Sequence, residues 1–218
     1  MFCKDPGESS ISVSIETRLF SCFSWEDGKF TAGKHAAKVK NNLQLRRDSD
    51  LSIKFSGLIT KKILSNELIK SFALPKKIHG TIFSKSTSGM KYGRHIDNAY
   101  MSSGRADLSF TVFLNCKKKY EGGALSIQGL NSEEKFKLDA GEIIIYPSTY
   151  LHSVEKVIDG ERLVFIGWIE SYVKSIEERE YLFDLDAAAR SLLAKYGRSE
   201  EVDLIYKSYS NFLRRLGN

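Results

Sequence analysis

Three residues of this sequence, His95, Asp97 and His152, have the side-chain types and the spacing of a transition-metal site. The segment around His95 is predicted to be a strand, in which residues i and i+2 point to the same side, so the imidazole and the Asp97 carboxylate should converge. His152 lies just past a predicted apolar strand, Glu142–Tyr146. Two histidines and one carboxylate on one face leave about three coordination positions open, as in the non-haem Fe(II) oxygenases. The same ligand types also suit zinc and hydrolysis.

The H-x-D triplet alone is a weak signal, because a surface pair or a core histidine gives the same pattern. Arg162, ten positions after the second histidine, adds to it. On a predicted strand it shares a face with Val164, Ile166 and Trp168. A guanidinium there is costly to bury without an anion, and its planar fork matches a carboxylate. An exposed cation at a strand edge is the alternative. Triad and arginine together indicate a ligand with two acidic or chelating ends, a description that 2-oxoglutarate fits.

The elements that position these residues are predicted from the period of the apolar residues. The first seventy residues favour helices, with Leu51, Phe55 and Ile59 near helical spacing. From Pro75 to Glu170 the period is two, with turn residues between short segments, which is typical of a sandwich or barrel. The predicted strands are Asp107–Cys116, Ala124–Gln128, Lys135–Leu138, Glu142–Tyr146 and Arg162–Glu170. Helices are predicted again over Ile176–Tyr196 and Glu201–Leu216.

Composition excludes several classes of protein. The 218 residues are 42% hydrophobic, enough for a substantial core, so a disordered chain is excluded. No stretch approaches the roughly 18 apolar residues that span a bilayer, and the start of the sequence lacks a signal-peptide core, so we expect a cytoplasmic protein without a membrane partner. The net charge of +6 is spread over scattered lysines, and we do not expect nucleic acid as a partner.

The spacing of the two histidines, the aspartate and the arginine resembles that of Fe(II)/2-oxoglutarate dioxygenases of the prolyl-4-hydroxylase type. The bacterial PKHD-type hydroxylase family is the closer match, and the resemblance covers nearly the whole chain. Its motifs are Thr31–Gly33, Val39–Leu45, Ala73–Pro75, Met90–Ala99, Arg105–Ser109, Tyr120–Gly123, Tyr146–Ser148, Leu182–Asp186 and Tyr209–Arg215.

The resemblance implies a fold that is mainly β with flanking helices: a double-stranded β-helix (jelly roll) with helices at both ends. Residues 1–170 would form a helical lead-in and the dioxygenase core, and 171–218 a helical extension packed on it. Iron would be held by His95, Asp97 and His152, while Arg162 would bind the distal carboxylate of 2-oxoglutarate.

Related prolyl hydroxylases use a tyrosine to help hold the co-substrate, and the matching position here is Phe113, which has no hydroxyl. Thr111, Ser109 or Tyr92 is expected to take that role. The resemblance implies hydroxylation of a small-molecule, amino-acid or peptide substrate with dioxygen, release of succinate and CO2, and ascorbate as a possible reductant. A homo-oligomer, and a jelly roll that senses metal or 2-oxoglutarate without turnover, are the further options.

Other residues invite structural interpretations. Arg105 and Asp107 are predicted to pair with each other, and Trp168 to belong to the core. His35 and His79 lack carboxylate neighbours at ligand spacing, so both are interpreted as structural.

Overall fold

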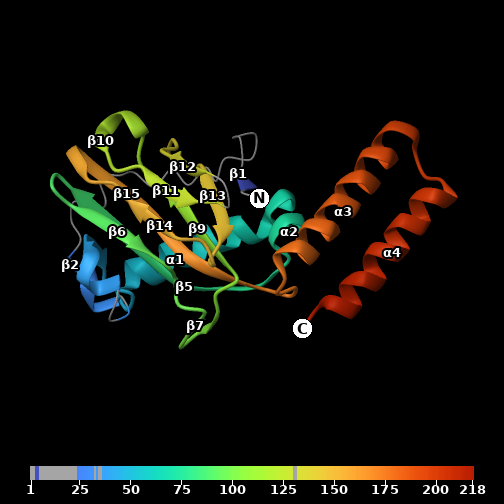
Figure 1. Ribbon diagram of the computed structural model, residues 1–218, viewed down its shortest axis with the longest axis horizontal. Helices are drawn as coiled ribbons and strands as arrows, with labels where there is room; N and C mark the ends of the chain where they lie inside the picture. The colour runs from blue at the N-terminus through green and yellow to red at the C-terminus, as the bar shows by residue number, and fades with distance from the viewer. Residues whose placement is uncertain (1–2, 5–23, 32, 34–35, 130–131) are drawn as a thin grey trace.

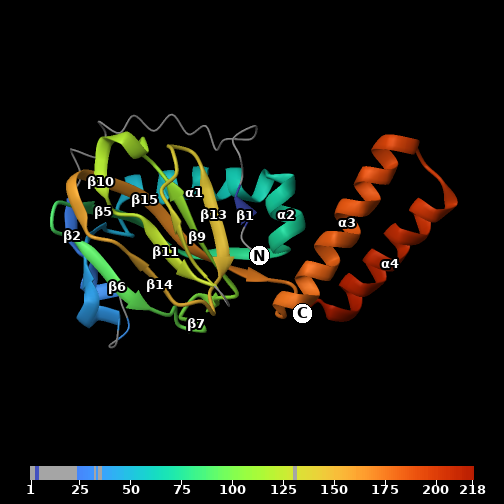
Figure 2. The ribbon, with the colours of Figure 1, turned by 45° about the horizontal axis from the view of Figure 1, so that its top comes forward.

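The structure is a computed structural model that describes residues 3–4, 24–31, 33, 36–129 and 132–218. Antiparallel strands form two principal sheets that face each other, with helices outside them (Figures 1 and 2). Mainly β structure with flanking helices confirms the predicted fold class.

The larger sheet has the order β1-β13-β9-β15-β5-β4-β2, and β10 pairs with one end of β15. The central strand is β15, which lies between β9 and β5 over most of its length. The strands are β1 (Cys3–Lys4), β2 (Trp25–Asp27), β4 (Leu43–Leu45), β5 (Pro75–Thr87), β9 (Leu108–Phe113), β10 (Tyr120–Gly122), β13 (Ile143–Pro147) and β15 (Val157–Ser171).

The smaller sheet has the order β12-β11-β14-β6-β3. Its strands are β3 (Lys40–Asn41), β6 (Lys91–His95), β11 (Leu125–Gln128), β12 (Glu133–Phe136) and β14 (His152–Val154). A separate two-stranded ribbon pairs β7 (Tyr100–Met101) with β8 (Gly104–Arg105).

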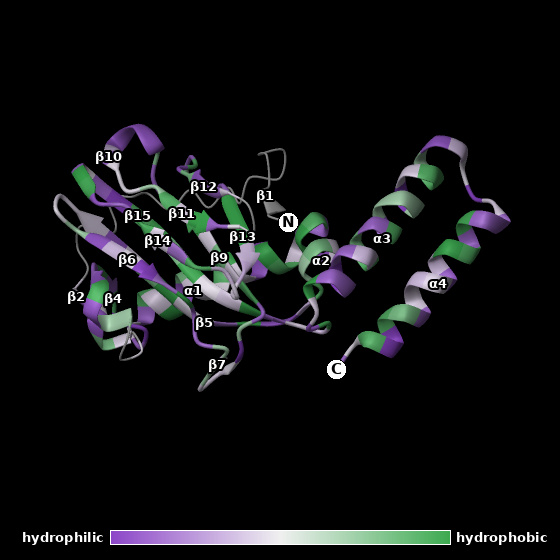
Figure 3. Cartoon of the chain, viewed as in Figure 1, coloured by the Kyte–Doolittle hydropathy of each residue, from purple (hydrophilic) through white to green (hydrophobic). Residues whose placement is uncertain are grey.

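Alternation along β9 divides the core into two layers, as the sequence predicts. Leu108, Phe110 and Val112 point away from the smaller sheet and pack with residues of α1 (Asp50–Ser65) and α2 (Glu67–Ala73). Phe113 points the other way and packs with Leu125 of the smaller sheet. Hydrophobic residues recur along β9, β13 and β15 (Figure 3). They belong to two core clusters, so both faces of the larger sheet are covered.

The last two helices form a hairpin that projects from the end of β15 (Figure 1). They are α3 (Ile176–Tyr196) and α4 (Glu200–Leu216), and Ser175 and Ser199 cap their first turns by accepting a backbone N–H. The base of the hairpin packs through Leu182 against Leu74 and Val173. None of the described helices is both long and apolar enough to cross a membrane.

The segment before α1 differs from the expected helical start. Its described part consists of the short strands β2, β3 and β4 and two 3-10 turns, Gly28–Thr31 and Ala36–Val39. Strands of two or three residues are too short to show a period, and these depend on pairing with β5 and β6. Among the described residues before β5, the expected α-helices are α1 and α2.

A partly buried ion pair joins the end of β15 to the segment that leads into β9. Arg105 Nε donates to Asp107 Oδ1 at 2.7 Å, and its Nη2 donates to the carbonyl of Ser171 at 2.8 Å. The backbone N–H of Ser171 donates to the other oxygen of Asp107 at 2.8 Å. The predicted structural pair is confirmed, and the hydrogen bond with Asp107 raises the pKa of Arg105.

Removal of this carboxylate should destabilise the fold. We expect Asp107→Ala to lower the free energy of unfolding by about 3 kcal/mol, because a guanidinium and a backbone N–H lose their acceptor inside the protein. Urea denaturation followed by circular dichroism measures the change. Asp203→Ala, which breaks the exposed Arg198–Asp203 pair, is the control and should have little effect. Equal effects of the two substitutions would contradict the structural role of Asp107.

Candidate metal centre and its cavity

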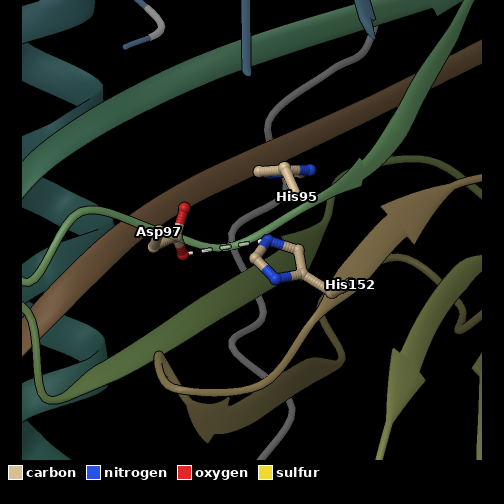
Figure 4. A group of neighbouring side chains, drawn as sticks. All are labelled: His95, Asp97 and His152. Atoms are coloured by element: carbon tan, nitrogen blue, oxygen red, sulfur yellow. Dashed lines mark ion pairs between the residues drawn. The ribbon is translucent and has the colours of Figure 1, made fainter. Parts of the chain in front are cut away.

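Three potential metal ligands meet where two interior strands of the smaller sheet, β6 and β14, end and begin. His95 ends β6 and His152 begins β14, and the two residues are directly opposite in the antiparallel pairing of these strands. Asp97 lies two residues beyond β6. One ligand atom of each residue lies within 4.8 Å of the others, and all three side chains point toward a common centre (Figure 4).

The convergence of His95 and Asp97 has a different cause from the one predicted. The strand ends at His95, so strand alternation does not align the two side chains. The non-repetitive chain after β6 instead brings the carboxylate back toward the histidines, and the Asp97 Oδ2 atom lies 3.8 Å from His152 Nε2.

Backbone carbonyls select which nitrogen of each imidazole is free. His95 Nδ1 lies 2.8 Å from the Gly93 carbonyl, and His152 Nδ1 lies 3.1 Å from the Tyr150 carbonyl. A carbonyl only accepts, so each Nδ1 carries the proton and each Nε2 keeps its lone pair. Metal-binding histidines are commonly oriented in this way.

The third ligand is held from the larger sheet. Ser109 Oγ, on β9, donates to Asp97 Oδ2 at 2.6 Å and lies 2.7 Å from Ser148 Oγ. The Ser109 hydroxyl thus orients the carboxylate, and Ser148 contacts Ser109 in turn. Ser109, which the sequence predicts as a candidate co-substrate residue, lines the cavity between the two sheets and also donates to Asp97.

Burial keeps His95 neutral. Burial, followed by the neighbouring His152, lowers the pKa of His95 to about 4. The ring is therefore unprotonated at neutral pH, as a metal ligand must be. Tyr92 stacks on it with ring centroids 3.6 Å apart, and burial followed by the charge of Asp97 raises the pKa of this phenol.

A cavity of about 240 Å³ extends from this cluster between the two sheets. The residues around it that bear on the predictions are Tyr92, Ser109, Thr111, Tyr146, Arg162 and Trp168. Phe113 is not among its lining residues; its ring is fully buried and lies 5.5 Å from the Arg162 guanidinium carbon. Trp168 was predicted as core and lines the cavity.

Arg162 is a buried cation without an acidic partner among the described residues. Only 3% of it is exposed, and its Nε has no hydrogen-bond partner. Burial lowers the pKa of the guanidinium, while the nearby Tyr120 and Tyr146 oppose that shift. The arrangement leaves the guanidinium ready to pair with an anion that enters the cavity.

Tyr146 was missed by the sequence reasoning. It lies on β13 opposite Ser109, its ring packs edge-on to His152 at 5.2 Å, and its hydroxyl is within reach of Thr111. Burial raises the pKa of this hydroxyl well above its ordinary value. Strand alternation could have indicated that Tyr146 faces inward, because Tyr146 and Ile144 share a face of the strand predicted over Glu142–Tyr146.

Two further expectations concern the remaining histidines. His79 is structural, as predicted, because its ring nitrogens lie 2.9 Å from Ser103 Oγ and 2.8 Å from the Arg105 carbonyl. His35 lies outside the described residues.

Family models match the chain in two segments: the 2OG-Fe(II) oxygenase superfamily over residues 81–170 and the PKHD-type hydroxylase C-terminal domain over 177–217. A PKHD-type hydroxylase of Prochlorococcus marinus strain MIT 9215 is 78% identical over 194 residues, which cover 89% of this chain and 88% of the relative. Another, from strain MIT 9211, is 56% identical over 211 residues, 97% and 95% of the two chains.

Solved structures share the fold at low identity. A Pseudomonas putida prolyl-4-hydroxylase aligns with a TM-score of 0.51 and 16% identity, covering 78% of this chain and 92% of the other. A Trichoplax adhaerens prolyl hydroxylase, solved with a hypoxia inducible factor peptide fragment, aligns with a TM-score of 0.55 and 16% identity over 83% and 86%.

The two-sheet fold and the superfamily match define a 2OG-Fe(II) oxygenase with a jelly-roll core. Within that class, the chain belongs to the PKHD-type hydroxylase family, and it is an oxidoreductase. The family implies Fe(II), 2-oxoglutarate, dioxygen and a small-molecule or peptide substrate. The His-Asp-His cluster has the donor set that Fe(II) requires.

The hydroxyl behind Asp97 should contribute to metal affinity. We expect Ser109→Ala to weaken Fe(II) or Mn(II) binding by about 10- to 100-fold, because the carboxylate loses the donor that orients it. Anaerobic calorimetric titration measures the affinity. Ser153→Ala, on the same strand as His152 but on its opposite face, is the control. Unchanged affinity in Ser109→Ala would show that Asp97 is positioned without this bond.

Proposed function

We propose that this chain is an Fe(II)- and 2-oxoglutarate-dependent dioxygenase that hydroxylates an amino-acid or peptide substrate and releases succinate and CO2. The observation that carries the proposal is the presence of the unpaired, buried Arg162 in the same cavity as the His-Asp-His cluster. A metal and a cation in one enclosed space fit a ligand that chelates at one end and is anionic at the other.

The metal site of the proposal consists of His95, Asp97 and His152. The two Nε2 atoms and the Asp97 carboxylate would hold Fe(II), with the Gly93 and Tyr150 carbonyls and Ser109 fixing their orientation. When bound, iron supplies the oxidation chemistry that couples decarboxylation of 2-oxoglutarate to hydroxylation of a C–H bond.

The co-substrate site of the proposal is built around Arg162, which would pair with the distal carboxylate in bidentate fashion. Tyr146 and Thr111 lie in the same cavity and offer hydroxyl donors, so we assign to them the role that a tyrosine at the Phe113 position would have. The guanidinium of Arg162 lies over the ring of Phe113 in a cation–π contact. Tyr92 orients His95 by stacking, which replaces the co-substrate contact expected of it.

The walls of the cavity would exclude water from the reacting groups. Val164 and Ile166 of β15 and Leu125 of β11 line it, so an anion bound at Arg162 is screened little by solvent. The raised pKa values of Tyr92 and Tyr146 keep both phenols protonated, which makes them hydrogen-bond donors and leaves no competing anion at the metal.

The proposal also covers the helical extension, the reductant and the cellular compartment. We assign residues 171–218 to an extension that packs on the core through Leu182, and ascorbate to the role of reductant for oxidised iron. A reducing compartment such as the cytoplasm suits Fe(II) and the free thiol of Cys116.

The test is anaerobic titration of Fe(II) and 2-oxoglutarate into the metal-free protein. The wild type should develop the visible charge-transfer band of the chelate. His152→Ala should lose the band, and Arg162→Ala should bind 2-oxoglutarate about 100-fold more weakly, because a desolvated charge pair is lost. Arg94→Ala, which removes an exposed guanidinium next to His95, is the matched control and should keep the band.

Aerobic turnover then distinguishes an enzyme from a sensor. Succinate that accumulates with consumption of 2-oxoglutarate supports the dioxygenase. A normal band without any succinate, even with candidate substrates, would favour a binding protein, and no band despite tight metal binding would favour zinc chemistry.

A further inference from the structure

A second buried cation, Lys40, lines the cavity from the smaller sheet. Lys40 is on β3, directly opposite Tyr92 in the pairing with β6, and only 4% of it is exposed. Its ammonium lies 5.1 Å from the centroid of the Tyr92 ring, and the same ring stacks on His95. One aromatic ring therefore separates this charge from a metal ligand.

The ammonium of Lys40 is incompletely partnered. Lys40 Nζ donates to Thr31 Oγ1 at 3.0 Å, and Thr31 in turn donates to Gln44 Oε1 at 2.6 Å. No carboxylate within the described part of the chain forms an ion pair with Lys40. An ammonium has three N–H donors, so two remain for a ligand in the cavity, and leaving a buried charge in this state is costly.

Further donors continue the same wall toward the opening. Arg47 lines the cavity, and its Nη2 donates to the Gly80 carbonyl at 3.4 Å. No described acidic side chain forms an ion pair with Arg47. Gly80 has a φ of +64°, and a Cβ there would lie 2.6 Å from the ring of Trp168, so the glycine permits the indole to pack here. The Trp168 Nε1 is buried and has no acceptor.

These donors are separate from the Arg162 site. Lys40 lies on β3 of the smaller sheet, against the Tyr92 ring that stacks on His95. Arg162 lies on β15 of the larger sheet, over the ring of Phe113. The metal ligands therefore lie beside Lys40, and a co-substrate bound at Arg162 leaves Lys40 to another anion.

Resting on the proposed function, we infer that the hydroxylated substrate is an acidic compound whose carboxylate binds Lys40, with Arg47 attracting it at the mouth of the cavity. The cavity of about 240 Å³ also receives the co-substrate, so the part of the substrate that enters is of amino-acid size. Lys40 is thereby a specificity-determining residue, and the place of the carboxylate fixes which C–H bond faces the metal ligands.

The test uses paired probes and the protein loaded anaerobically with Fe(II) and 2-oxoglutarate. N-acetyl-L-proline and N-acetyl-L-prolinamide form one pair, and the same derivatives of leucine form the other. Calorimetry should show that the carboxylates bind wild type at least about tenfold more tightly than the amides. Lys40→Met should lose at least about tenfold in carboxylate affinity, and Arg47→Met a smaller factor, since it lies at the exposed mouth.

Lys38→Met is the matched control, because Lys38 is two residues away and exposed. It should bind the probes as wild type does. All three variants should keep the charge-transfer band with unchanged 2-oxoglutarate affinity, and that band also shows that each variant is folded. If Lys40→Met does not fold, the wild-type preference for acid over amide and the Arg47→Met loss still test the inference.

Four results would overturn it. Equal affinity for acids and amides, or no saturable binding of the acids, would contradict the inference that the substrate is acidic. A fall in 2-oxoglutarate affinity in Lys40→Met comparable to that of Arg162→Ala would assign Lys40 to the co-substrate. Absence of the band in wild type would instead overturn the proposed function, and the acidic substrate with it.

Discussion

The hydrogen bond from Ser109 to Asp97 is the contact on which the candidate site depends. His95 and His152 belong to neighbouring strands of the smaller sheet, and their spacing follows from strand pairing alone. Asp97 lies in irregular chain and takes its position from a hydroxyl of the larger sheet. The ligand set is complete only when the two sheets are correctly packed, so the geometry of the site requires the packed core.

Burial of charge without an internal partner is the second constraint. Arg162 and Lys40 each line the cavity without an ion-pair partner among the described residues, which a stable fold tolerates only when the surrounding core is well packed. The layer between α1, α2 and the larger sheet provides that packing, with Ile59, Ile63 and Phe165 almost fully buried. Stability contributed on one face of the sheet thus permits charged groups on the other.

The sequence predicted what local periodicity encodes. Alternation placed Arg162, Val164 and Trp168 on one face of β15, and the spacing of His95, Asp97 and His152 identified the ligand cluster. Local periodicity could not predict the features that depend on tertiary pairing. Strands such as β3 have no period to detect, so Lys40 could not be distinguished from a surface lysine, and the turn of the chain that returns Asp97 has no local signature.

The hairpin of α3 and α4 begins and ends at the same place. The backbone N–H of Asn218 donates to the Tyr172 carbonyl at 2.9 Å, beside the contacts of Leu182 and Leu213 with Val173. Its tip around Gly197 lies far from the sheets (Figure 2). The hairpin is therefore a loop closed at its base, whose tip can open and reclose as a local unit while the cavity stays intact. Amide exchange in this protein should be graded along the hairpin, fast at the tip and slow at the base.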